Sequence, residues 1–198
     1  MGGATSFLTD PEPTDEVRRL YDEDLDGDGY VMNLTRVWAH VPAGRDAISA
    51  LMGAATSAGG LSMRQRGVLV SATASTIGDS YCSLAWGRRL AREVGDHTAA
   101  GVLTGDDSGL DPAERALAGW ARKVARDPNS TTEADVQALR DAGFSDQEIV
   151  AITAYVAGRV AFSTVNDALG ALPDAELIPR VPEPVRAVVD WGRPPAQS

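Results

Sequence analysis

The chain has 198 residues, enough for one domain with a real core, and its 43% hydrophobic residues are normal for a globular protein. Its formal net charge of −10 argues against a nucleic-acid partner, because phosphate binding needs clustered Lys and Arg. The single cysteine excludes an intrachain disulfide and a cysteine-rich metal site. Because the sequence shows neither an apolar run long enough for a membrane helix nor an export signal, we expect a cytoplasmic protein without a membrane partner.

The first conspicuous segment, DLDGDGYVMNLT, resembles a calcium-binding loop. Asp24, Asp26 and Asp28 occupy ligand positions one, three and five of such a loop, and Gly29 occupies the turn position. Position twelve is Thr35, which offers one neutral hydroxyl where a bidentate carboxylate is required. The match is partial, so the remainder of the chain must decide whether calcium is bound.

Helix start signals recur along the chain, whereas no comparable strand signal is found. Capping boxes are predicted from pairs of residues three positions apart: Ser62 with Gln65, Ser130 with Glu133, and Ser145 with Glu148. A fourth helix is predicted to begin at Asp111 and Pro112, with Glu114 in its first turn. The sequence therefore predicts an all-α protein of about eight to ten helices.

The core of this fold is predicted from two apolar segments, 62–78 and 145–170, which are helices buried on most sides. We expect one helical domain over 1–172, built on two core helical hairpins, followed by a Pro-rich arm over 173–198 with one short helix near its end. The apolar surface of 145–170 and the arm together favour a homo-oligomer, most simply a two-fold dimer.

A family resemblance is carried by LSMRQRGVLVSATASTIGDSYCSLAWG at 61–87. It resembles the LSxRxRE and GCxYCxxxH signature of the alkylhydroperoxidase-like, or carboxymuconolactone decarboxylase-like, family. GYVMNLTRVWAHVP at 29–42 is similar to that family's GxVPNxxRxxAHxP, and the likeness is closest to the subgroup labelled peroxidase-related. The resemblance implies an alkylhydroperoxidase-like fold. It also implies that 22–28 is a solvated helix end rather than a metal site.

Peroxide-reducing members of this family share a glutamate, two cysteines separated by two residues, and a histidine four residues after the second cysteine. Those positions fall on Gly67, Asp79, Cys82 and Trp86, so only Cys82 matches. The chemistry needs a thiolate, a resolving thiol and groups that relay the proton. A carboxylate at Asp79, one helical turn before Cys82, would also disfavour the thiolate.

The candidate site residues each have a structural alternative. Cys82 and Asp79 are the candidate catalytic residues, but the structural interpretation is favoured for both: Cys82 as a small core residue and Asp79 as a helix N-cap. Trp86, Tyr81 and Gly67 are the candidate substrate-binding residues, where Trp86 either stacks on a ligand or fills the space that a histidine would occupy. We expect neither a metal nor a cofactor.

Three functions are compatible with this sequence. The first is a non-redox enzyme that acts on a small organic metabolite in the family cavity. The second is a catalytically silent protein that binds a ligand or a partner, and the third is a one-Cys peroxidase that uses Cys82 with an external thiol.

The composition also indicates a bacterial source. Nearly all of the 18 basic residues are Arg, a bias usual in high-GC bacteria.

Overall fold

The regular structure of the chain is entirely helical in the computed structural model, which describes residues 5–197. The α-helices are α1 Asp15–Asp28, α2 Asn33–Trp38, α3 Pro42–Ala58, α4 Met63–Ile77, α5 Ser80–Val94, α6 Asp96–Thr104, α7 Pro112–Arg126, α8 Glu133–Asp141, α9 Asp146–Ala168 and α10 Glu183–Val188. Two short 3-10 turns lie at Pro128–Ser130 and Ile178–Arg180. The all-α prediction is confirmed.

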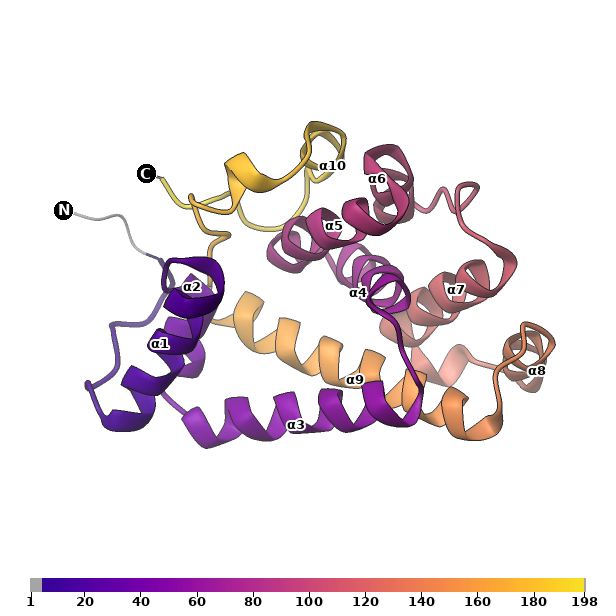
Figure 1. The fold of residues 1–198 in the computed structure, drawn as a ribbon, viewed down its shortest axis with the longest axis horizontal. Helices are drawn as coiled ribbons and strands as arrows, with labels where there is room; N and C mark the ends of the chain where they lie inside the picture. Colours follow the sequence, from indigo (N-terminus) through magenta and orange to yellow (C-terminus); the bar gives the residue numbers. More distant parts are fainter. Residues whose placement is uncertain (1–4, 198) are drawn as a thin grey trace.

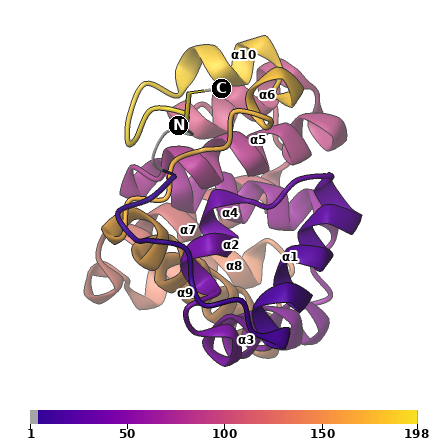
Figure 2. The ribbon, with the colours of Figure 1, turned by 90° about the vertical axis from the view of Figure 1, so that its left-hand side faces the viewer.

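The helices form three tiers around one main core (Figures 1 and 2). Helices α10, α6 and α5 lie in the upper tier, α4 and α7 in the middle, and α9 and α3 below. One expected core hairpin is the consecutive pair α4 and α5. The second core pair, α3 and α9, joins segments about one hundred residues apart that run antiparallel in Figure 1.

Helix α9 is long and apolar enough to cross a membrane by length and composition alone. In this fold it packs against α3, α4 and α7, and it carries the buried polar residues Arg159, Ser163 and Asn166. One side of α9 therefore belongs to the core, but Val150 is 70% exposed, so the helix is not buried on most sides as predicted for 145–170.

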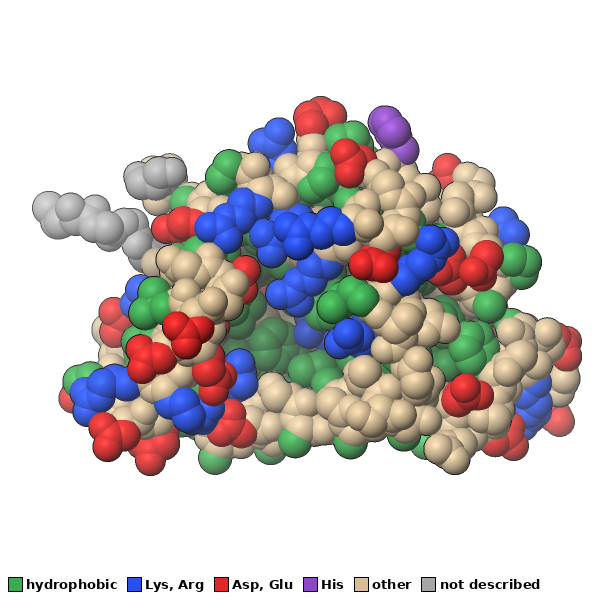
Figure 3. All heavy atoms as spheres, viewed as in Figure 1, with side chains coloured by type: hydrophobic (Ala, Val, Ile, Leu, Met, Phe, Trp, Pro, Cys, Tyr) green, Lys and Arg blue, Asp and Glu red, His purple; other side chains and the backbone are tan. Residues whose placement is uncertain are grey.

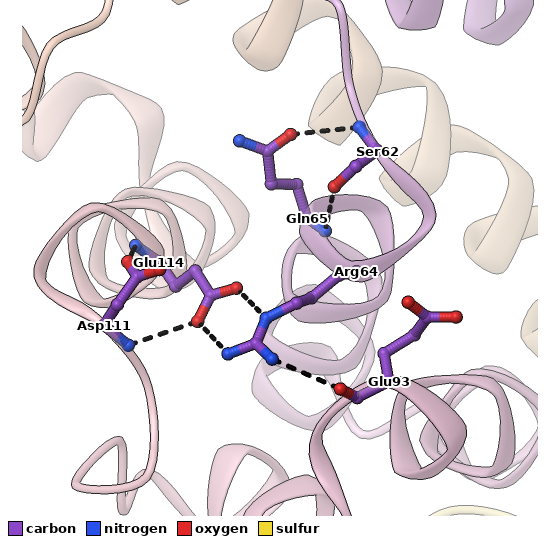
Figure 4. Close-up of polar contacts among 6 residues, drawn as sticks. All are labelled: Ser62, Arg64, Gln65, Glu93, Asp111 and Glu114. Carbon is purple, nitrogen blue, oxygen red and sulfur yellow. Dashed lines mark hydrogen bonds and ion pairs between the residues drawn. The ribbon is translucent and has the colours of Figure 1, made fainter.

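An ion pair between Arg64 and Glu114 joins the start of α4 to the start of α7 (Figure 4). Glu114 is buried, and its second carboxylate oxygen accepts from Arg64 Nη2 at 2.8 Å and from the Asp111 backbone N–H at 3.2 Å. The carboxylate therefore closes the capping box of α7 while it holds α4 in place, and the N-terminal end of the α7 dipole favours its charge.

The helix starts follow the predicted capping boxes except at α8. Ser62 and Gln65 cap α4, and Ser145 and Glu148 cap α9, as expected. The box predicted at Ser130 is wrong, because Ser130 ends the 3-10 turn that Pro128 begins. Thr132 and Asp135 form the capping box of α8 instead, two residues further along.

The Pro-rich arm folds back onto the bundle rather than extending from it. Val185 of α10 is fully buried against α5 at Gly87, where a Cβ atom would lie 2.7 Å from Val185 Cγ1. At the base of the arm, the buried carboxylate of Asp174 accepts from the Tyr81 hydroxyl and, at 2.7 Å, from the Asn33 backbone N–H. The arm is thus tied to both α5 and the start of α2.

The acidic run of the sequence forms the last two turns of α1, which ends at Gly29 in the left-handed conformation (φ 82°). Asp26 is exposed, as expected of a solvated helix end, but Asp24 is buried and accepts from the Met32 backbone N–H at 2.9 Å. Asp24 therefore holds the α1–α2 turn through a hydrogen bond. Within residues 5–197 no cluster of His, Cys, Asp or Glu has the arrangement of a metal site.

Candidate functional site

The N-terminus of α5 sets the position of the only cysteine. Asp79 is the N-cap, and its Oδ1 accepts from the Cys82 backbone N–H at 2.8 Å. The side chain of Asp79 is fully buried. Helical spacing then places Cys82, Trp86 and Arg89 on one face of α5, because residues three or four apart share a face.

This face of α5 borders a cavity of about 190 Å³ between α2, α3, α5 and α9. Its wall is mostly apolar and aromatic, and Trp38 stacks on Phe162 with ring centroids 5.2 Å apart. The lining residues are Met32, Leu34, Thr35, Trp38, Arg45, Ser49, Met52, Tyr81, Cys82, Ala85, Trp86, Arg89, Arg159 and Phe162. A wall of this kind, with a few polar groups, is typical of small-molecule sites.

The Cys82 thiol lies on the inner wall and is almost completely buried. Arg159 Nη2 donates to Cys82 Sγ at 3.1 Å, and the Ser163 hydroxyl lies 3.7 Å from the same sulfur. Burial raises the pKa of the Cys82 thiol far above its ordinary value, and the Asp79 carboxylate raises it further, although Arg159 acts in the opposite direction. The thiol is therefore protonated at neutral pH, as the sequence indicated.

Two arginines without carboxylate partners face the cavity. Arg159 is only 7% exposed, and its guanidinium lies 5.2 Å from the ring centroids of both Trp86 and Phe162. Its Nε has no hydrogen-bond partner in residues 5–197. Arg89 lies 4.9 Å from the Trp86 ring centroid, and burial lowers its pKa. Among the described residues neither arginine forms an ion pair.

The cavity continues outward into a more open hollow of about 470 Å³ that shares Trp86, Arg89 and Arg159 and adds Arg66. Figure 3 shows the hollow above α3, with a hydrophobic floor and Lys or Arg side chains gathered along its upper edge. The mouth of the site is therefore basic in a protein whose net charge is −10.

The candidate site residues fall into two groups. Tyr81, Cys82 and Trp86 line the cavity, although the Tyr81 hydroxyl turns away from it to bond Asp174. Asp79 lies behind Cys82 as a helix cap and is not part of the lining.

Gly67 lies elsewhere, in the contact between α4 and α5. A Cβ atom at Gly67 would lie 3.1 Å from Leu90 Cδ1, so glycine allows the two helices to approach closely. The structure thus gives Gly67 a packing role, and it does not line the cavity.

Sequence reasoning missed Arg159, Arg89, Trp38 and Phe162. Arg159 left one signal, since it is the only charged residue between Glu148 and Asp167, in the apolar segment IVAITAYVAGRVAFSTVN. A lone charge on a core helix indicates a functional or paired group.

Comparison with solved structures identifies the fold. A peroxidase-related protein from Ralstonia eutropha JMP134, described as an alkylhydroperoxidase AhpD core, is 28% identical with a TM-score of 0.79, over 91% of this chain and 100% of the other. The chain has the alkylhydroperoxidase-like fold. A second peroxidase-related protein, from Silicibacter sp. TM1040, is 22% identical with a TM-score of 0.77, over 89% of this chain and 95% of the other.

The same fold occurs in the debrominase Bmp8, of which a cysteine-to-alanine variant was solved in complex with 2,3,4-tribromopyrrole. That structure is 15% identical to this chain, with a TM-score of 0.71, and the likeness covers 87% of this chain and 95% of the other. At this identity the comparison shows the fold alone. No protein-family model and no curated protein matches the sequence.

Proposed function

We propose that this protein acts on a small organic molecule in the cavity beside Cys82, by a reaction that does not pass through a disulfide. The observation that carries the proposal is the setting of Cys82. It is the only cysteine in the sequence, its thiol is buried, and the carboxylate of Asp79 lies one turn before it on α5. A thiol–disulfide cycle needs a thiolate and a resolving thiol. This site disfavours the thiolate of Cys82, and the sequence has no second cysteine to act as the resolving thiol.

The cavity itself supports binding of a small molecule. Trp86, Phe162 and Tyr81 provide flat apolar surface, and the cavity opens to solvent through the hollow beside α3. In this reading Trp86 and Tyr81 bind the substrate, the Cys82 thiol contacts it, and Asp79 keeps that thiol protonated. The debrominase Bmp8, which has the same fold, was crystallised with a one-ring organic molecule, and this supports a small organic substrate for the present cavity.

Peroxide consumption separates this proposal from a one-Cys peroxidase. We expect no Cys82-dependent loss of cumene hydroperoxide, with or without an added dithiol, because a protonated thiol is a poor nucleophile and any sulfenic acid would lack an internal partner. The matched control is Cys82→Ser, which preserves the size and polarity of the side chain. A clear rate above that of Cys82→Ser would contradict the proposal.

Turnover separates the proposal from a silent binding protein. A thermal-shift screen of small organic metabolites identifies compounds that bind the folded state, and mass spectrometry then measures their conversion. We expect at least one stabilising compound to be converted by the native protein and not by Trp86→Ala. Binding without any conversion would favour the silent binding protein.

A further inference from the structure

Arg159 is a buried guanidinium that forms no ion pair with a carboxylate within residues 5–197. It is 93% buried, since only 7% of its surface is exposed, and its polar contacts are the sulfur atoms of Cys82 at 3.1 Å and Met52 at 3.9 Å. Sulfur is a weak acceptor, and the Arg159 Nε has no hydrogen-bond partner among the described residues. Buried charges are normally paired because removing them from water is costly, so this guanidinium lacks the anion that would offset its burial.

The cavity around Arg159 and its mouth are lined by basic but not by acidic side chains. Arg45, Arg66, Arg89 and Arg159 line the cavity or its mouth, and neither lining includes an aspartate or a glutamate. Of these four, only Arg45 forms ion pairs within residues 5–197. A cavity lined by one sign of charge with apolar walls concentrates ligands of the opposite sign.

Size and shape restrict the anion further. A cavity of about 190 Å³ is smaller than the roughly 300–1,000 Å³ of pockets for drug-sized ligands, and an apolar cavity of about 150 Å³ holds benzene. The Arg159 guanidinium lies against the rings of Trp86 and Phe162, so a ligand that reaches this group is in contact with flat aromatic surface. The space therefore suits a single ring with one anionic substituent.

We infer that the cavity takes a small, flat organic anion, namely a one-ring carboxylate, whose carboxylate accepts hydrogen bonds from Arg159 while its ring packs on Trp86 and Phe162. Arg89 lies 4.9 Å from the Trp86 ring centroid and lines both the cavity and the outer hollow, so it adds a second positive charge. This inference rests on the proposed function, since it names the class of molecule that the cavity would bind.

Titration calorimetry with benzoate and benzamide tests the inference, because the two probes share size and shape and only benzoate is charged. A hydrogen bond to a charged group contributes about 1.5–3 kcal/mol, so we expect Arg159→Met to weaken benzoate binding about 10- to 150-fold. Benzamide binding should weaken less, because its carbonyl accepts a hydrogen bond from Arg159 but carries no charge. The matched control is Arg115→Met, which removes an exposed arginine of α7 outside the cavity. It should bind benzoate as the native protein does.

The Arg159 variants should fold, since they remove an unpaired buried charge. Arg159→Gln provides a second substitution of similar length, and both variants should unfold at or above the melting temperature of the native protein without ligand. Failure of benzoate to bind, or equal binding to native protein and Arg159→Met, would overturn the inference. The proposed function would still stand if uncharged compounds were bound and converted, whereas Cys82-dependent peroxide consumption would overturn that function and leave the anion result intact.

Discussion

Two substitutions at Asp79 separate its two effects on the site. In the native protein, Asp79 Oδ1 accepts from the Cys82 backbone N–H at 2.8 Å. Asp79→Asn keeps an oxygen that can accept this hydrogen bond but removes the charge. Asp79→Ala removes both. Loss of a helix N-cap costs about 0.5–2 kcal/mol, and for a chain of this size each kcal/mol lowers the melting temperature by about 2–4 °C. We therefore expect Asp79→Ala to melt about 1–8 °C lower, and Asp79→Asn to melt near the native protein.

The thiol should respond to the charge alone. The Asp79 carboxylate is the second cause, after burial, that raises the pKa of Cys82, so both substitutions should lower that pKa and speed alkylation by iodoacetamide at a given pH. Circular dichroism gives the melting temperatures, and mass spectrometry gives the alkylation rates. Equal destabilisation by Asn and Ala, or an unchanged pH profile in both, would refute this account of Asp79.

Three further predictions concern stability and assembly. Glu114→Gln removes the buried carboxylate that binds Arg64, and we expect a loss of about 1–3 kcal/mol in urea unfolding; an unchanged midpoint would contradict it. Burial and the nearby Asp79 raise the pKa of Asp167 from 3.8 to about 7, so the folded state binds the extra proton and stability should fall as pH rises through that window. Asp167→Asn should flatten this dependence of stability on pH, and an unchanged dependence would contradict the raised pKa of Asp167. Finally, we expect a dimer through the exposed apolar face of α3 and α9, so light scattering should give twice 20.8 kDa for the native protein and the monomer mass for Val150→Asp.

Much of the fold could be predicted because its signals are local. The capping pairs at Ser62 and Ser145 satisfy backbone groups within one helical turn, so the sequence alone places these helix starts. At α8 the local signal was ambiguous, since both Ser130 with Glu133 and Thr132 with Asp135 have the required spacing. Ser130 is already the last residue of the 3-10 turn that begins at Pro128, so it cannot cap α8, and the helix begins after Thr132.

The site could be predicted only in part because its residues come from distant segments. Cys82 and Trp86 were found because they fall on positions of the family motif within one segment, whereas Arg159 reaches Cys82 from 77 residues away. Gly67 was assigned to the cavity because it falls on the position of the family's glutamate, but only the packing of α4 on α5 shows that it faces Leu90. Which helices pair is a property of the whole chain, and spacing along one helix cannot supply it.

The proposal that the cavity binds a one-ring carboxylate through Arg159 is tested most directly by locating a bound ligand in a crystal structure. A crystal structure of the protein with para-bromobenzoate would locate the ring through the anomalous signal of bromine and the carboxylate through its density. We predict one bromine peak inside the cavity, with the ring against Trp86 and Phe162 and the carboxylate within hydrogen-bonding distance of Arg159. A bromine peak outside the cavity, or a carboxylate directed away from Arg159, would contradict the account.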